Sequence, residues 1–271
     1  MRAHLRLPAL AAALLLAANP AHADAPLWEL GLGLGGLSLP HYRGSDQTHH
    51  VVLPVPYAVY RGQIFRATRE GARAVLLDSQ RVDVDLGVAA SAPTRSRDNT
   101  ARSGMPDLAP TFEIGPTVNV SLGRGAGWKL DLRLPVHAVV TLESRPQSLG
   151  WAASPVLNLD LDVAGWNLGL QAGPMWASRR VNAYVYDVAP AYATATRPAY
   201  AAEGGYAGWR WTTAASRRLG KAWVGAYLRG DSVGGARFEA SPLVRQRQTL
   251  SAGLAVSWVF AVSDARVSID D

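Results

Sequence analysis

The sequence predicts an all-β protein: a transmembrane, antiparallel, up-and-down β-barrel of about twelve strands, with about ten as the alternative count. Apolar and polar residues alternate with a period of two in segment after segment, as they do along strands with one apolar face. Long polar connections alternate with tight turns. After the N-terminal segment no apolar run is long enough to cross a bilayer as a helix. Because hydrocarbon tolerates only helices and closed barrels, a spanning protein with this pattern must be a barrel.

The N-terminus is typical of a secretory signal peptide. Arg2 and Arg6 precede an apolar run over residues 7–18, and Ala21-His22-Ala23 provides a small-x-small cleavage site. We therefore expect residues 1–23 to be a signal peptide for Sec-type export, cleaved after Ala23. Removing them takes away two of the 27 basic residues and none of the 21 acidic ones. The remaining positive charge is too mild to predict a nucleic-acid partner.

The final strand-like segment, residues 250–260, shows the alternation most clearly. Leu250, Leu254, Trp258 and Phe260 fall on one face, with small or polar residues on the other. Aromatic residues at a strand end are typical of the membrane interface of a barrel. Trp258 and Phe260 are therefore predicted to close the barrel as an aromatic end. Parity alone leaves the alternative open in which the apolar face points inward, as in a soluble barrel.

Similar segments recur along the chain. The expected strands cover residues 28–35, 49–60, 63–69, 72–78, 82–88, 112–122, 128–138, 157–163, 166–172, 206–217, 222–231 and 250–260. A single-chain barrel with both termini in the periplasm needs an even number of strands. Dividing 63–78 at Glu70-Gly71 satisfies this requirement. The expected domains are thus the signal peptide, a barrel over residues 24–260 and a short polar tail over residues 261–271.

Charged residues gather on the polar face of neighbouring predicted strands. Buried charges persist when they are paired and hydrogen-bonded, so the favoured interpretation is a lumen braced by ion pairs. The alternative is a pore lined by fixed charges. The candidate lumen residues are Asp83, Asp85, Glu113, Lys129, Asp131, Arg133, Asp160 and Asp162.

Catalytic, metal and cofactor signals are weak. His137 is the single histidine in the middle of a predicted strand, and nothing fixes Ser121 or Ser154 beside it as a nucleophile. His49 and His50 are adjacent and so point to opposite strand faces, which makes a poor metal site. The chain has no cysteine. We therefore expect no enzyme activity, no metal and no cofactor.

Several passages together resemble the MltA-interacting protein (MipA/OmpV) family of Gram-negative outer-membrane proteins. They occur in the family's order along nearly the whole mature chain, and each alone is weakly specific. The passages are Gly31–Gly35, Tyr42–Asp46, Val52–Pro56, Tyr186–Val188, Ser241–Val244 and Leu250–Phe260.

The resemblance implies an outer-membrane barrel in contact with lipid. It also implies a scaffold role that brings a lytic transglycosylase and a peptidoglycan synthase together during murein growth. It carries no catalytic motif. Alternatives for the function are a diffusion channel for small solutes and an adhesin that acts through extracellular loops such as the tyrosine-rich segment 178–204. One departure is that the chain continues past the aromatic Phe260 through residues 261–271.

Overall fold

The computed structural model describes residues 23–62, 65–68, 71–77, 79 and 81–269. Most of the predicted signal peptide and Glu70 lie outside these residues. The strands are β1 (Ala23–Pro26), β2 (Trp28–Pro40), β3 (Thr48–Arg61), β4 (Phe65–Thr68), β5 (Gly71–Leu77), β6 (Val82–Ala90), β7 (Thr111–Gly125), β8 (Trp128–Thr141), β9 (Ser148–Ala153), β10 (Val156–Val163), β11 (Trp166–Ala177), β12 (Gly205–Leu219), β13 (Ala222–Ser232), β14 (Gln248–Val262) and β15 (Arg266–Ile269). One α-helix, α1 (Arg179–Tyr186), and the short 3₁₀ helices η1 (Ser96–Asp98), η2 (Thr100–Arg102) and η3 (Pro190–Tyr192) lie in connections.

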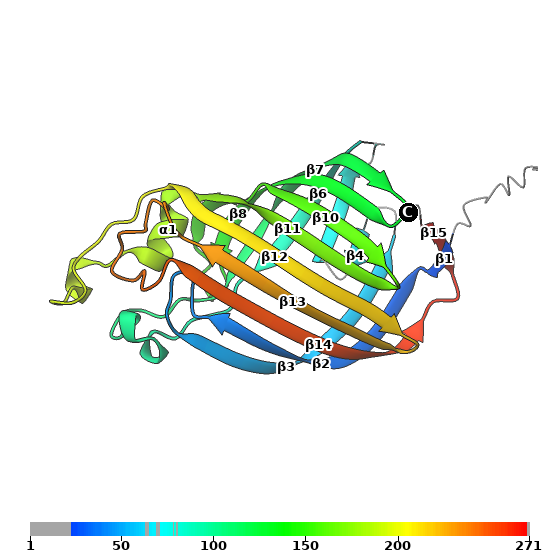
Figure 1. Cartoon of the computed structure of the whole chain (residues 1–271). Coiled ribbons are helices and arrows are strands. Elements are labelled where there is room, and N and C mark those ends of the chain that lie inside the picture. The colour runs from blue at the N-terminus through cyan, green and yellow to red at the C-terminus, as the bar shows by residue number, and fades with distance from the viewer. Residues whose placement is uncertain (1–22, 63–64, 69–70, 78, 80, 270–271) are drawn as a thin grey trace, which may run out of the picture.

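The large sheet is antiparallel and closes on itself (Figure 1). From β2 to β9, and again from β10 to β14, each strand pairs with the next along the chain, and β14 returns to pair with β2. Both β9 and β10 pair with β8 on one side and β11 on the other, so they occupy one position of the wall. The predicted fold class is confirmed. The described strands pair in an order compatible with twelve wall positions, but β4 joins β3 through two residue pairs, and the count of twelve stays a prediction.

The apolar face of most strands points outward, but β3 is an exception, because Leu53, Val55 and Val59 of its alternating apolar set face the lumen. In β14, Leu254, Trp258 and Phe260 are 63%, 58% and 64% exposed, whereas Ser257 on the opposite face is 1% exposed. A soluble barrel would bury the apolar side chains and expose the polar ones. The orientation is that of a barrel whose solvent is lipid.

Exposed aromatic side chains lie near both ends of the strands. At the end that carries the termini and the short turns, the exposed rings are Tyr60, Trp128, Trp166, Trp258 and Phe260. At the opposite end they are Trp151, Trp176, Trp209 and Trp211. Two such girdles bound the apolar band of outer-membrane barrels. Within the described part of the chain, no helix has the length and apolar character to cross a membrane.

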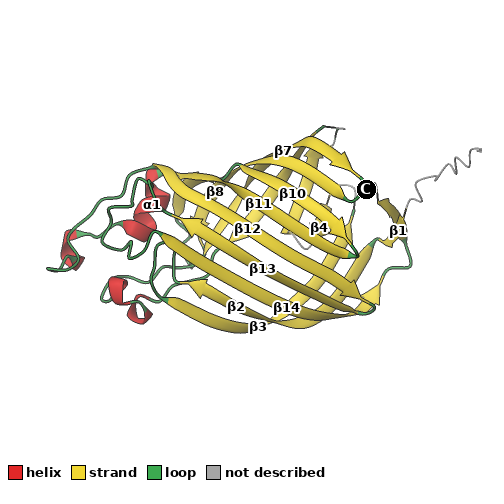
Figure 2. Ribbon diagram, viewed as in Figure 1, coloured by secondary structure: helices red, strands yellow, loops and turns green. Residues whose placement is uncertain are grey.

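The two ends of the barrel differ (Figure 2). The helices and the long connections lie at the end opposite the termini, and we call the segments 41–47, 91–110, 178–204 and 233–247 the loop cap. Turns of a few residues join β7 to β8, β10 to β11 and β12 to β13 at the other end. Since barrels have short periplasmic turns and longer extracellular loops, the termini mark the periplasmic end.

The chain ends pair with each other outside the barrel. β14 continues to Val262, and β15 then pairs antiparallel with β1, with Val267 opposite Ala25. Two hydrogen bonds hold this small sheet to the barrel end: Leu27 N–H to Ala265 O and Ser263 N–H to Trp28 O, both 2.9 Å. Part of the expected polar tail is therefore a strand. The segment 178–204, expected to be irregular, contains α1, and β9 occupies part of a region expected to be a loop.

Candidate functional site

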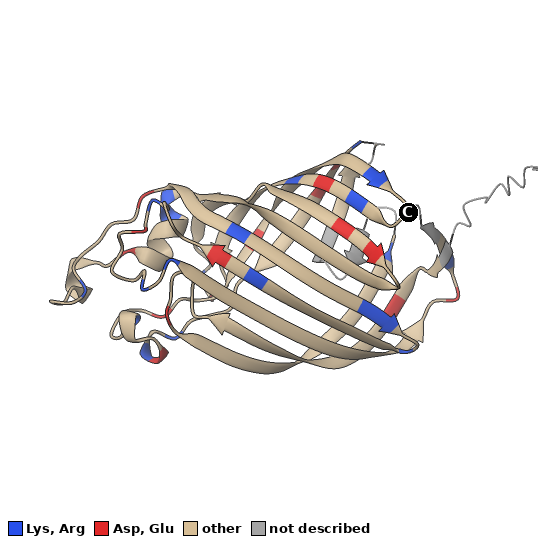
Figure 3. Cartoon of the chain, viewed as in Figure 1, with Lys and Arg blue, Asp and Glu red and all other residues tan. Residues whose placement is uncertain are grey.

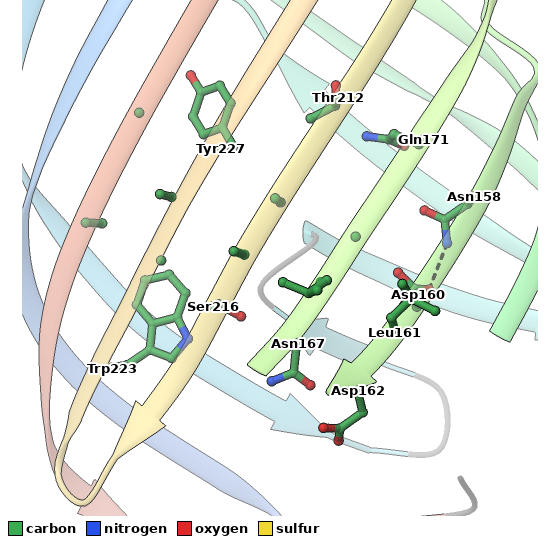
Figure 4. A pocket seen from close by; sticks show the side chains of 18 of the residues that line it. Asn158, Asp160, Leu161, Asp162, Asn167, Gln171, Thr212, Ser216, Trp223 and Tyr227 are labelled. Carbon is green, nitrogen blue, oxygen red and sulfur yellow. Dashed lines mark hydrogen bonds between the residues drawn. The ribbon is translucent and has the colours of Figure 1, made fainter. Parts of the chain in front are cut away.

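The barrel encloses a cavity of about 1010 Å³. The strands that line it are mainly β2, β3, β8 and β10 to β14. Figure 4 shows polar side chains from β10 and β11 on one side and aromatic rings from β13 on the other. The lumen is the candidate functional site.

Part of the polar wall is a connected group of charges on β8 and β10. Lys129 Nζ lies 3.1 Å from Asp131 Oδ2, and Arg133 Nη2 lies 3.3 Å from Asp160 Oδ2 and 3.9 Å from Asp131 Oδ2. Asp131 is only 3% exposed. Asn158 donates a further hydrogen bond of 2.7 Å to Asp160. Four of the eight candidate lumen residues thus lie together.

The other four candidates lie apart from this group. Asp85 is buried on β6 and accepts a hydrogen bond of 2.8 Å from Asn119 Nδ2. Asp83 accepts from the backbone N–H of Ser79 at 3.3 Å, in the turn that precedes β6. The last two are Glu113, which lies beside His137, and Asp162, which lines the cavity at the end of β10.

A second charged cluster, which the sequence reasoning missed, lies near the periplasmic end. The buried Glu29 of β2 accepts from Arg61 Nη2 at 2.7 Å and from Arg218 Nη1 at 2.9 Å. The Arg218 guanidinium also lies 5.9 Å from the ring centroid of Tyr57. Strand parity alone could have placed these side chains on the inner face, but it gives no sign that β2 and β12 face one another.

A third interior pair lies toward the extracellular end. Arg210 Nε of β12 donates a hydrogen bond of 2.8 Å to the buried Asp231 Oδ1 of β13, directly opposite it in the register. Figure 3 shows charged residues on β8, β10, β12 and β13 and none on β14. Ionic contacts therefore occur at several levels of the barrel interior and on strands all around it.

Above the Glu29 cluster, the cavity wall on β2, β3 and β13 is largely apolar and aromatic. The cavity is lined there by Leu37 of β2, Leu53 and Val55 of β3, and Trp223 and Tyr227 of β13. Tyr57 and Trp223 also contact each other, with ring centroids 5.8 Å apart. The two walls of the cavity thus differ in chemical character.

His137 lies beside Thr117 and Glu113 on the inner side of the wall. Thr117 Oγ1 lies 3.4 Å from His137 Nε2, and Glu113 Oε2 lies 3.8 Å from Nδ1, which is beyond hydrogen-bond distance. Neither Ser121 nor Ser154 has a hydrogen bond to this histidine among the described contacts. The described residues contain no group of three or more histidine, aspartate or glutamate side chains placed to hold a metal ion.

The loop cap is a packed unit. The rings of Tyr186 and Phe238 are stacked with centroids 3.7 Å apart, and burial raises the pKa of Tyr186. Tyr42 Oη donates to Leu243 O, and Tyr186 Oη donates to Arg43 O, both at 2.9 Å. These contacts join three of the four cap segments.

Arg102 connects the fourth segment to the rest of the cap. It is 3% exposed and donates to Val185 O at 2.7 Å, to Pro106 O at 3.1 Å and to Ser96 Oγ at 3.2 Å. Burial lowers the pKa of its guanidinium, with the neighbouring tyrosines Tyr42 and Tyr184 opposing that shift. Segments far apart in the sequence are thus locked together at the extracellular end.

Comparison with solved structures gives outer-membrane proteins at low identity. They include a bacterial polysaccharide outer membrane secretin, with a TM-score of 0.43, 7% identity and coverage of 86% of this chain and 99% of that one. An outer membrane channel from Pseudomonas putida F1 has a TM-score of 0.41, 13% identity and coverage of 89% and 99%. Outer membrane phospholipase A from Escherichia coli has a TM-score of 0.33, 12% identity and coverage of 87% and 94%. These similarities are too distant to assign a function.

A search of curated protein sequences finds no match. The family comparison is positive and covers residues 32–260, from the first long strand of the barrel to the aromatic end of β14. The resemblance seen in the sequence passages is confirmed by this match. The chain is a β-barrel of the outer-membrane type, and it belongs to the family described as MltA-interacting protein MipA.

Proposed function

We propose that this barrel is a non-enzymatic scaffold whose periplasmic end docks a lytic transglycosylase and, with it, a peptidoglycan synthase. The family description names an interaction with MltA, and the resemblance implies that partner class. In this proposal Sec-type export and cleavage after Ala23 precede insertion into the outer membrane. The charged lumen residues brace the wall and have no catalytic role.

The observation that carries the proposal is the small sheet of β1 and β15. The periplasmic turns are short, and stable protein interfaces typically bury about 1,200–2,000 Å² in total, so the turns alone offer too little surface. The paired chain ends add a structured surface at that end of the barrel (Figure 1). Each strand of a two-stranded sheet has one unpaired edge.

An unpaired edge is a docking element of known type. An extended peptide can add a strand to an exposed edge, with main-chain hydrogen bonds that supply affinity. Cleavage after Ala23 would leave residues 24–26 to pair with β15, so the mature N-terminus would be held in this sheet. We infer that β15 and the turns beside it form the docking surface.

A pair of substitutions at one position tests the docking proposal. Val267→Pro removes a backbone N–H from β15, whereas Val267→Thr keeps it and retains a β-branched side chain. We expect crosslinked envelopes to yield a lytic transglycosylase with the wild type and Val267→Thr, and at least ten-fold less with Val267→Pro. Heat-modifiable migration in gel electrophoresis verifies that each barrel is folded. Equal recovery with both variants, or no murein enzyme with the wild type, contradicts the proposal.

A diffusion channel is the second candidate, favoured by the polar residues that line the cavity. The packed loop cap at one end and the Glu29 cluster at the other argue against a wide pore. Planar-bilayer recording of the pure refolded protein distinguishes the two functions, and the scaffold proposal predicts no stable conductance. An adhesin would instead lose surface binding when segment 178–204 is deleted.

A further inference from the structure

The two walls of the lumen have opposite chemical character. Figure 4 shows Asn158, Asp160 and Gln171 on β10 and β11, and Trp223 and Tyr227 on β13, with β12 between the two groups. Ion pairs that only stabilise the barrel wall would not require an apolar region and a polar region in the same cavity. A cavity with one apolar wall and one polar wall matches a ligand with an apolar part and a polar part.

Glycine residues keep the apolar wall open. A Cβ added to Gly225 would lie 2.4 Å from Trp223 Cη2, so the indole lies along the wall over this glycine. A Cβ at Gly253 would lie 2.4 Å from Tyr227 Cε1 and 2.7 Å from Leu37 Cδ2. Because these positions lack side chains, the neighbouring rings lie against the wall and leave the cavity free.

Two polar atoms in the cavity wall lack a protein partner. Thr212 is 8% exposed, and its Oγ1 has no hydrogen bond to any described residue. The indole Nε1 of Trp223 is buried and likewise unpartnered within the described residues. Buried polar groups are normally hydrogen-bonded, and these two side chains belong to the cavity lining although both polar atoms are themselves covered.

One edge of β3, a strand of the apolar part of the cavity wall, is largely unpaired among the described residues. β3 pairs with β2 along its whole length, but β4 pairs with β3 only at Tyr60 and Arg61. The rest of β3, residues 48–59, has no strand partner on that side among the described residues. Pro54 and Pro56 lie in this stretch, and proline is confined to edges of sheets because it has no N–H for a ladder.

Strand β6, which follows β4 and β5 in the sheet, also loses its partner on that side before it ends. β6 pairs with β5 only as far as Gly87, which is opposite Arg73, while Val88–Ala90 continue to pair with β7. Open sheet edges are avoided in hydrocarbon because unpaired backbone groups are costly there. Among the described residues, the sector between β3 and β6 is therefore the least paired part of the wall, and it adjoins the apolar side of the cavity.

We propose that the lumen binds a zwitterionic single-chain amphiphile, which reaches the cavity from the membrane past the unpaired edge of β3. The acyl chain lies along Leu37, Leu53, Val55 and Trp223. The headgroup lies against β8 and β10, where Lys129, Arg133 and Asp160 present both signs of charge. A cavity of about 1010 Å³ is at the upper end of the range for small-molecule sites, which is sufficient for one such molecule. This site is independent of docking at β15.

Native mass spectrometry tests the site with 14-carbon lysophosphatidylcholine as the probe. Ala255 lines the cavity, so Ala255→Trp places an indole inside it against the apolar wall, whereas Val256→Trp places the same ring on the outer face of the same strand. After the micelle is stripped, we expect the wild type and Val256→Trp to retain one probe molecule and Ala255→Trp to retain at least ten-fold less. Glycerophosphocholine, which lacks the chain, should not be retained. Equal retention by both tryptophan variants overturns the proposal.

Spin labels attached to introduced cysteines test the route of entry. Because the chain has no native cysteine, each variant carries its label at one known position. In bilayers we expect a label at Val55→Cys to be relaxed by oxygen more than by a water-soluble nickel chelate. A label at Gln171→Cys, on the polar wall, should show the reverse. Leu53→Cys replaces Val55→Cys if that variant does not fold. If the nickel chelate relaxes the label on β3 as strongly as the label at position 171, the proposed entry from the membrane is wrong.

Discussion

Glu29 of β2 accepts a hydrogen bond of 2.9 Å from Arg218 of β12, a residue 189 positions later in the chain. The same carboxylate accepts a bond of 2.7 Å from Arg61 of β3. In the sheet, β14 and β13 separate β2 from β12, so the contact spans the inside of the barrel near its periplasmic end. One carboxylate thus holds three strands together.

Glu29→Gln is expected to destabilise the barrel. The substitution leaves two partly buried guanidinium groups without their counter-ion, which we expect to cost about 1–3 kcal/mol because both arginines keep some contact with water. The temperature at which the folded form is lost in gel electrophoresis measures the effect. Glu203→Gln is the matched control, since its ion pair with Arg237 is exposed and contributes little. An equal loss in the two variants would contradict a specific role for Glu29.

Two glycines of β2 are expected to respond differently to substitution by alanine. A Cβ at Gly33 would lie 2.0 Å from Val256 O, whereas a Cβ at Gly36 would meet no atom within 4 Å. We expect Gly33→Ala to cost about 1–3 kcal/mol through overpacking against β14, and Gly36→Ala to have little effect. Urea unfolding in lipid vesicles provides the measurement. A stable Gly33→Ala barrel would mean that β2 and β14 can separate locally.

Arg102→Ala is expected to loosen the loop cap while the barrel stays folded. The variant loses three buried or partly buried hydrogen bonds to two cap segments, and we expect a loss of local stability on the order of 2 kcal/mol. Limited proteolysis of intact cells should cleave the cap segments 91–110 and 178–204 faster in this variant. Arg97→Ala changes an exposed arginine of the same segment and should leave the cleavage rate unchanged.

The loop cap is also expected to loosen in mild acid through His41. Burial lowers the pKa of this histidine, and the charge of His49 adds to the shift while Asp98 opposes it. The two rings are in edge contact with centroids 5.1 Å apart. As the pH falls below about 6.5, the usual value for histidine, the unfolded segment binds a proton before the folded one does. Cap stability therefore falls between that pH and the lower pKa of His41.

Protease sensitivity at successive pH values measures this effect. The wild type should be cleaved faster in the cap at pH 5.5 than at pH 7.5, and His41→Phe, which cannot titrate, should show a smaller difference. A His41→Phe profile identical to that of the wild type would assign the pH dependence to other groups.

Some features followed directly from the sequence. The strict alternation in Leu250–Phe260 predicted a strand with one apolar face, and β14 covers this segment with Leu254, Trp258 and Phe260 exposed. The division of residues 63–78 into two strands anticipated β4 and β5. These predictions succeeded because period-two patterns and turn residues are local properties of a chain.

Other features could not follow from local patterns. Parity placed Asp131 and Asp160 on inner faces, but only the register of β8 against β10 brings Arg133 between them. The pairing of β1 with β15 was also missed, because each is a strand of only four residues and they lie at opposite ends of the chain.

The sequence by itself determined most of the barrel strands, their alternation of apolar and polar faces and the family of this protein. The tertiary structure decided which inner faces meet: Glu29 with Arg218, the charged wall opposite Trp223 and Tyr227, and the edge of β3 beside the cavity. The reason is that side-chain direction depends on neighbours in the chain, whereas contacts across a lumen depend on strand register and barrel closure. No local pattern encodes those distances.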